Sequence, residues 1–136
     1  MKKLLILLVL LLMPTTGSAS DLYPWSWPDT LGQLGVTAVT ALDWGQTRYI
    51  SAHPTICFEA NPVLGVHPSM QKVDIYFPAV ILLELGVSYA APELVLLLGG
   101  SAALAEQART GAQGIFIGME GAVVGSNLRY GVKFNY

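Results

Sequence analysis

Apolar residues form long runs along most of this chain. Over residues 80–98 the runs do not alternate with a period of two, as half-buried strands would. We therefore expect an all-α fold, a single domain with about four membrane-embedded helices over residues 31–50, 73–91, 92–108 and 111–127. Pro92 and Glu93 mark the start of the third helix, because proline and acidic residues are favoured in a first helical turn.

The first twenty residues have the pattern of a secretory signal peptide. Lys2 and Lys3 precede an apolar run from Leu4 to Met13 that is too short to cross a bilayer, and small residues follow it. Cleavage near Ser20 would leave residues 21–136 as the mature domain. An uncleaved anchor is the alternative.

The composition narrows the class of protein. Of the 136 residues, 53% are hydrophobic and only 12% are charged. Soluble domains carry about 25% charged residues, so lipid is the expected surrounding. The net charge of −2 disfavours nucleic acid as a partner. No phosphate-binding glycine loop and no nucleophile motif is present, so we expect no enzyme activity and no cofactor.

Three acidic residues, Asp43, Glu84 and Glu120, fall inside apolar segments. An ionised carboxylate at membrane depth costs at least ~2.5 kcal/mol, so these groups must be neutral, paired with a base or hydrogen-bonded. We expect a polar network between helices that fixes their packing, and an ion or proton site is the alternative. Its expected members are Asp43, Gln46, Thr47, Glu59, Asn61, Glu84, Glu120 and Asn127.

The two histidines are weak candidates for metal ligands. His53 and His67 flank Cys57, the single cysteine, but their spacing matches no standard ligand template. Each histidine precedes a proline, which is typical of turns. We therefore expect hydrogen-bonded loop residues here and no metal.

Five glycines recur at spacings of three and four in the last expected helix. On a helical wheel they fall within an arc of about 80°. Such a smooth face lets another helix approach closely in a membrane, so we expect a homo-oligomer. A loop or a twisted strand is the alternative. The glycines are Gly111, Gly114, Gly118, Gly121 and Gly125.

The C-terminal residues 128–136 alternate and end on an aromatic residue, which resembles the last strand of an outer-membrane barrel. A small outer-membrane β-barrel is therefore an alternative fold, and the outer membrane an alternative location. An extended tail near the lipid headgroups explains the same residues with a helical fold.

The bacterial inner membrane is the expected location. With the amino end outside, the loop over residues 48–72 would face the cytoplasm with Arg48, Lys72 and Arg109. Arg129 and Lys133 would then lie on the other side.

One stretch resembles a known group. Residues 41–50, 59–65, 67–69 and 76–77, read as D-W-x-Q-T followed by E-x-N-P-x-L-G-x-H-P-S, are similar to short uncharacterised membrane proteins of proteobacteria and tailed phages. The resemblance implies a helical membrane protein without a known reaction. It also implies a role in the cell envelope or in lysis, although a cleavable signal departs from many phage holins.

Overall fold

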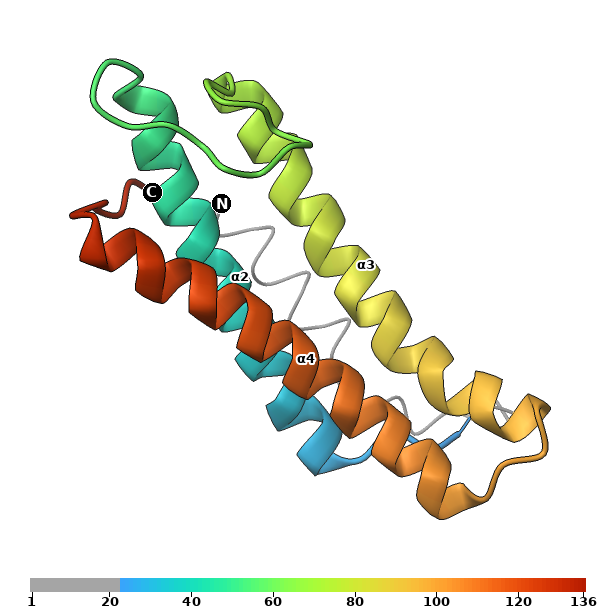
Figure 1. The fold of residues 1–136 in the computed structure, drawn as a ribbon. Coiled ribbons are helices and arrows are strands. Elements are labelled where there is room, and N and C mark those ends of the chain that lie inside the picture. Colours follow the sequence, from blue (N-terminus) through green and yellow to red (C-terminus); the bar gives the residue numbers. More distant parts are fainter. Residues whose placement is uncertain (1–22) are drawn as a thin grey trace.

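Three long helices make up most of the computed structural model, which describes residues 23–136 (Figure 1). With the labels of that figure they are α2 (Trp27–Ala52), α3 (Met70–Leu97) and α4 (Ala102–Arg129). The all-α prediction is confirmed. Residues 23–136 contain no strand, so the barrel alternative is wrong. The expected signal peptide lies outside the described residues.

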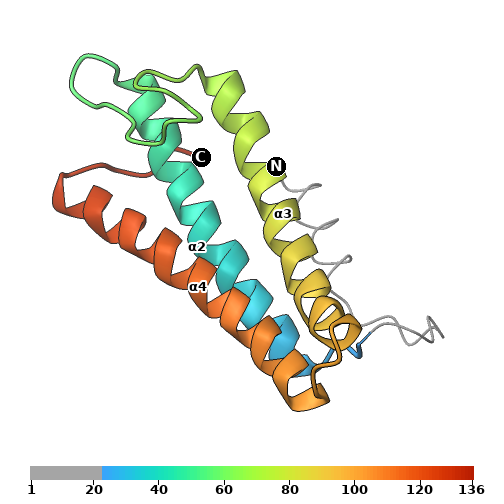
Figure 2. The same ribbon diagram turned by 45° about the vertical axis from the view of Figure 1, so that its right-hand side comes forward.

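Each helix runs antiparallel to the next one in the chain, so α2 and α4 point in the same direction. From the turn that joins them, α3 and α4 diverge, and α2 packs against both (Figures 1 and 2). At 1.5 Å per residue each helix is about 40 Å long, which exceeds the ~30 Å hydrocarbon core of a bilayer. We call the end with residues 53–69 and 130–136 the loop end, and the end with residues 23–26 and 98–101 the turn end.

The expected break at Pro92 is absent, and the expected count of four helices is wrong. Pro92 lies inside α3, and the chain turns at Gly99 instead, where φ is +81°. Glycine tolerates this left-handed conformation, and the Gly100 N–H donates to the carbonyl of Val95 at 2.8 Å. The Ser101 hydroxyl then caps α4, which continues without interruption through residues 108–111.

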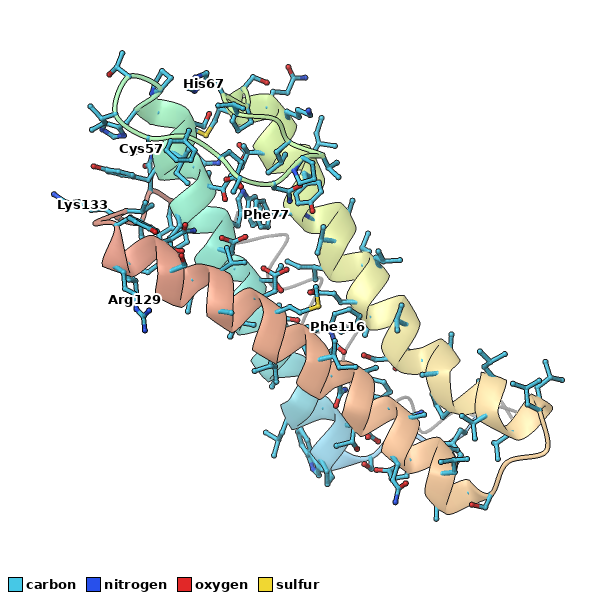
Figure 3. All side chains as sticks on the ribbon, in the orientation of Figure 1. Cys57, His67, Phe77, Phe116, Arg129 and Lys133 are labelled. Carbon is cyan, nitrogen blue, oxygen red and sulfur yellow. The ribbon has the colours of Figure 1, made fainter. Side chains whose placement is uncertain are left out.

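Because α3 continues through Pro92 and the chain turns at Gly99, some basic residues lie at the opposite end of the bundle from the one expected. Arg109 lies close to the turn end, whereas Arg129 and Lys133 lie at the loop end with Arg48 and Lys72. The expected grouping of Arg109 with the loop is therefore wrong. Figure 3 places Arg129 and Lys133 at the same end as Cys57 and His67.

The first helix begins earlier than predicted because its cap is Ser26. The Ser26 side chain accepts from the backbone N–H of Asp29, and the Asp29 carboxylate accepts from the Ser26 N–H at 2.7 Å. This reciprocal pair is a capping box, with Trp27 and Pro28 in the first turn. We expected the helix to start near Leu31.

Burial in the bundle is inverted relative to a water-soluble protein. Among residues 23–136, buried polar and charged side chains outnumber buried apolar ones. Large apolar side chains on α3, such as Ile75 and Leu83, are 65% exposed. By length and composition, α3 is also the one described helix that could cross a membrane by itself, where four were expected.

The loop end has a small apolar core of its own. Leu64, Val73 and Phe77 are buried there, and the rings of Trp44 and Tyr76 pack against them. The tail after α4 is extended and returns to α2, where the Asn135 N–H donates to the carbonyl of Gly45 at 2.9 Å. The tail is therefore not a barrel strand.

Candidate functional site

The candidate site is the polar interior, which is built on one face of α2. Residues spaced by three and four along this helix are directed inward because they share one side of a 3.6-residue turn. The row covers about 27 Å, close to the thickness of a bilayer's hydrocarbon core. Its buried polar members are Asp29, Gln33, Thr37, Thr40, Asp43 and Thr47.

At the turn end the interior holds one fully buried cation, Arg109 of α4. Its Nη1 donates to the Asp29 carboxylate at 2.8 Å and to the carbonyl of Pro24 at 2.9 Å. Its guanidinium also lies over the ring of Trp25, 4.9 Å from the centroid. Trp25 in turn stacks on Tyr89 at 4.2 Å. Arg109 thus joins the segment before α2 to both neighbouring helices, and we call Arg109 and Asp29 the arginine layer.

The proline inside α3 supplies part of this layer. Pro92 has no backbone N–H, so the carbonyl of Ser88, four residues earlier, has no helical partner. The Nε of Arg109 donates to that carbonyl at 3.1 Å. Gln113, one turn further along α4, donates to the carbonyl of Asp29 at 3.0 Å. Arg109 therefore supplies the hydrogen bond that the carbonyl of Ser88 lacks because of Pro92.

Nearer the loop end, one acidic residue from each helix meets in the interior, and we call this set the carboxyl layer. It consists of Asp43 of α2, Glu84 of α3 and Glu120 of α4. Asp43 and Glu84 are buried there, and Glu120, which is partly exposed, is close enough to both to interact with them electrostatically. The Thr40 hydroxyl lies 3.1 and 3.0 Å from the two carboxyl oxygens of Glu84 and 3.0 Å from the carbonyl of Val36, and its single proton is shared among these acceptors.

Two amides adjoin the carboxyl layer on its loop side. Asn127 of α4 donates to Gln46 at 3.0 Å and, more weakly, to Asp43 at 3.4 Å. Gln46 donates to the carbonyl of Val124 at 3.3 Å. Five of the eight residues expected in a polar network, namely Asp43, Gln46, Glu84, Glu120 and Asn127, are thereby brought together between the helices.

The other three expected network residues hold the loop. Thr47 donates to Glu59 at 3.2 Å, and Glu59 accepts the backbone N–H of Asn61 at 2.8 Å. The Asn61 amide donates to the hydroxyl of Tyr76 at 2.9 Å. These contacts fix the loop between α2 and α3, so the motif with Glu59 and Asn61 has a structural role here.

The first part of the resemblance, residues 41–50, also has a structural role. Asp74, in the first turns of α3, accepts from Trp44 Nε1 at 3.0 Å and from Arg48 Nη1 at 2.6 Å. Trp44 and Arg48 are four residues apart and therefore share a face of α2. The pair holds the start of α3 against the end of α2.

His53 contacts the last turn of α2. His53 Nδ1 lies 2.8 Å from the carbonyl of Tyr49, and its ring stacks on the Tyr49 ring. Within the part of the chain that the structure describes, no group of three histidine, cysteine or acidic side chains could hold a metal ion.

The five glycines of α4 lie on the face away from the other helices. A Cβ added at any of them would meet no atom within 4 Å. The helical prediction for this stretch is right, but the stripe packs against nothing in residues 23–136. The polar positions Gln113, Glu120 and Asn127 occupy the opposite, inward side of α4.

Sequence reasoning missed part of the interior. Gln33, Thr37 and Thr40 are buried polar residues that we did not predict. Each is separated from the next polar position on α2 by three or four residues up to Asp43, and this spacing is the signal that could have found them, because it continues the same helix face.

Comparison with known proteins adds no assignment. No family model, no curated protein and no solved structure matches this chain.

Proposed function

We propose that this chain is a small integral membrane protein whose three helices cross the bacterial inner membrane together, and that it acts by associating with copies of itself, without catalysing a reaction. The inverted burial described above carries this proposal. The resemblance of residues 41–77 to short membrane proteins of proteobacteria and phages supports a role in the cell envelope or in lysis.

The exposed apolar side chains argue for lipid as the solvent of the bundle. Leu82 and Leu94 of α3 and Ile115 and Met119 of α4 are each more than half exposed. Burying such a side chain is worth about 1.5–3 kcal/mol, so a soluble fold would place them inside. In lipid, however, apolar side chains favour the outside and polar groups favour one another.

The distribution of charge supports one orientation. Arg48, Lys72, Arg129 and Lys133 lie at the loop end, whereas Arg109 near the turn end is buried and paired with an acid. Basic residues favour the cytoplasmic side of bacterial membrane proteins. The loop end would therefore face the cytoplasm. This agrees with the expected signal peptide, which would deliver the turn end to the outside.

The glycine face of α4 is the proposed contact between copies. Glycines spaced by three and four let two helix backbones approach closely, and packing then replaces the hydrophobic effect as the attraction. The face is open along its whole length, and apolar side chains such as Ile115 lie beside it. The occupant we propose is α4 of a second copy.

Membrane insertion and orientation can be tested together with the single cysteine, Cys57, which lies at the loop end. Alkaline carbonate should leave the protein in the membrane pellet. A membrane-impermeant maleimide should label Cys57 in inverted vesicles and not in intact spheroplasts. Release by carbonate would overturn insertion, and labelling in spheroplasts would overturn the orientation.

Self-association can be tested with Gly118→Leu and Gly121→Leu. A Cβ at either position meets no atom of the described chain within 4 Å, so each copy should fold normally while the helices can no longer approach. Light scattering in mild detergent should show loss of the oligomer. Gly86→Leu on the open face of α3 is the matched control. An unchanged oligomer in both α4 variants would refute the glycine contact.

A further inference from the structure

The carboxyl layer has no basic partner, although each helix contributes an acid to it. Among residues 23–136 the ion pairs are Arg109 with Asp29 and Arg48 with Asp74, and neither involves the layer. Glu59 in the loop, which interacts electrostatically with Asp43, is also acidic.

The neutral groups that face the carboxyl layer are hydrogen-bonding ones. They are Thr40 on α2, which donates to Glu84, and Asn127 on α4, which donates to Asp43. Asp43 and Glu84 are buried, and two ionised carboxylates cannot be stable there on these contacts alone, because burial without a counter-charge costs several kcal/mol per ion.

A second feature lies on the α2 face next to this layer. Gln33 is completely buried, and neither atom of its side-chain amide has a hydrogen-bond partner within the described residues. The hydroxyl of Thr37 is buried and equally without a partner there. Thr37 lies one turn before Thr40, and Gln33 lies one turn before Thr37, so the row leads directly to the carboxyl layer.

Buried polar groups of this kind point to water. A buried donor or acceptor without a partner costs about 1–3 kcal/mol, and ordered water is the usual compensation in folded proteins. A buried water needs two to four polar partners, and the pairs one helical turn apart, Gln33 with Thr37 and Thr37 with Thr40, can contribute them.

We propose that Asp43, Glu84 and Glu120 form a proton-binding site in the interior of the bundle, and that it exchanges its protons with water held along α2 by Gln33 and Thr37. In the exchange, the O–H bond of a carboxylic acid breaks as a water oxygen takes the proton, leaving a carboxylate and a hydronium ion. The reverse transfer restores the acid. No redox partner or metal is required.

This proposal goes beyond self-association, and its test is independent of it. The experiment is infrared spectroscopy of the full protein in lipid vesicles at neutral pH, which detects the C=O stretching band of protonated carboxyl groups. We expect this band in the wild-type protein, and we expect it to shift in D₂O because water reaches the site.

Matched variants assign the band. Glu120→Gln and Asp43→Asn keep the side-chain size and should each cause loss of band intensity. Asp74→Asn should leave the band unchanged, because Asp74 lies outside the carboxyl layer and is paired with Arg48. Circular dichroism verifies that each variant is folded. Absence of the band at neutral pH, or a band that both interior variants leave intact, would overturn the site.

The isotope shift tests the water separately. A band that fails to shift after prolonged exposure to D₂O would overturn the exchange with water. Gly118→Leu, which should abolish the oligomer, should leave the band in place. The proton site and the self-association can therefore fail independently.

Discussion

The arginine layer and the carboxyl layer are buried in the same bundle, yet they compensate their charge in different ways. In the arginine layer, Asp29 is 2% exposed and faces a fully buried guanidinium. In the carboxyl layer, Glu84 is equally buried and has a threonine hydroxyl as its donor. One layer is balanced by an opposite charge, whereas the other can be balanced only by protons.

This difference separates a structural role from a chemical one. Arg109 binds carbonyl groups of the segment before α2 and of α3 as well as the Asp29 carboxylate. Such a group fixes the positions of several elements at once, and its charge has no reason to change. The carboxyl layer lacks that fixed partner, so the protonation state of its members can vary.

The largest predicted effect comes from removing the cation. Arg109→Leu should destabilise the protein by about 3–5 kcal/mol, because Asp29 is left buried without its counter-ion. The carbonyl groups of Pro24 and Ser88 lose their donor as well. Unfolding in a titration of SDS against mild detergent, followed by tryptophan fluorescence, measures the change.

The matched control is Arg129→Leu at the far end of the same helix, where the guanidinium is exposed. A surface substitution of this kind should change the free energy of unfolding by no more than about 0.5 kcal/mol. Equal effects of the two substitutions would contradict the arginine layer as a structural element.

The second prediction compares the two layers with one kind of substitution. Asp29→Asn should cost about 1.5–3 kcal/mol, because it removes a charge-assisted hydrogen bond and leaves Arg109 buried without its counter-ion. Asp43→Asn should cost less than about 1 kcal/mol, because an amide can replace a protonated carboxyl group. The same SDS titration compares them. A larger loss from Asp43→Asn would mean that the carboxyl layer holds the helices together more strongly than the arginine layer.

The helical class was predictable, and the connection of the helices was not. Long apolar runs and helical spacing predict the helices themselves. Pro92 misled the prediction because proline is equally compatible with a first helical turn and, in a membrane, with a helix interior. In this chain Pro92 lies in a helix interior, where Arg109 donates to the carbonyl of Ser88 that the proline leaves without a helical partner. That contact comes from another helix and cannot be read from local sequence.

The candidate site was predictable to a similar extent. Asp43, Glu84 and Glu120 could be selected because acids are costly in apolar segments. Thr37 and Gln33 could be found only by continuing the helix face of Asp43, since a threonine or a glutamine in a helix is unremarkable by itself. Glu59 and Asn61 were grouped with the interior acids, but the structure places them in the loop, where they bind backbone and Tyr76.

The smallest predicted effect is at the loop end, where Arg48 and Asp74 form an ion pair with side chains 19% and 37% exposed. Water screens such a pair, so Asp74→Asn should cost about 0.5–1 kcal/mol at low salt and less at high salt. Asp29→Asn, in contrast, should show the same loss at both salt concentrations because its partner is fully buried. The salt dependence of the two losses in the SDS titration therefore distinguishes a solvated contact from the arginine layer. A salt-independent loss for Asp74→Asn would place the loop pair out of reach of water, inside lipid or an interface between copies.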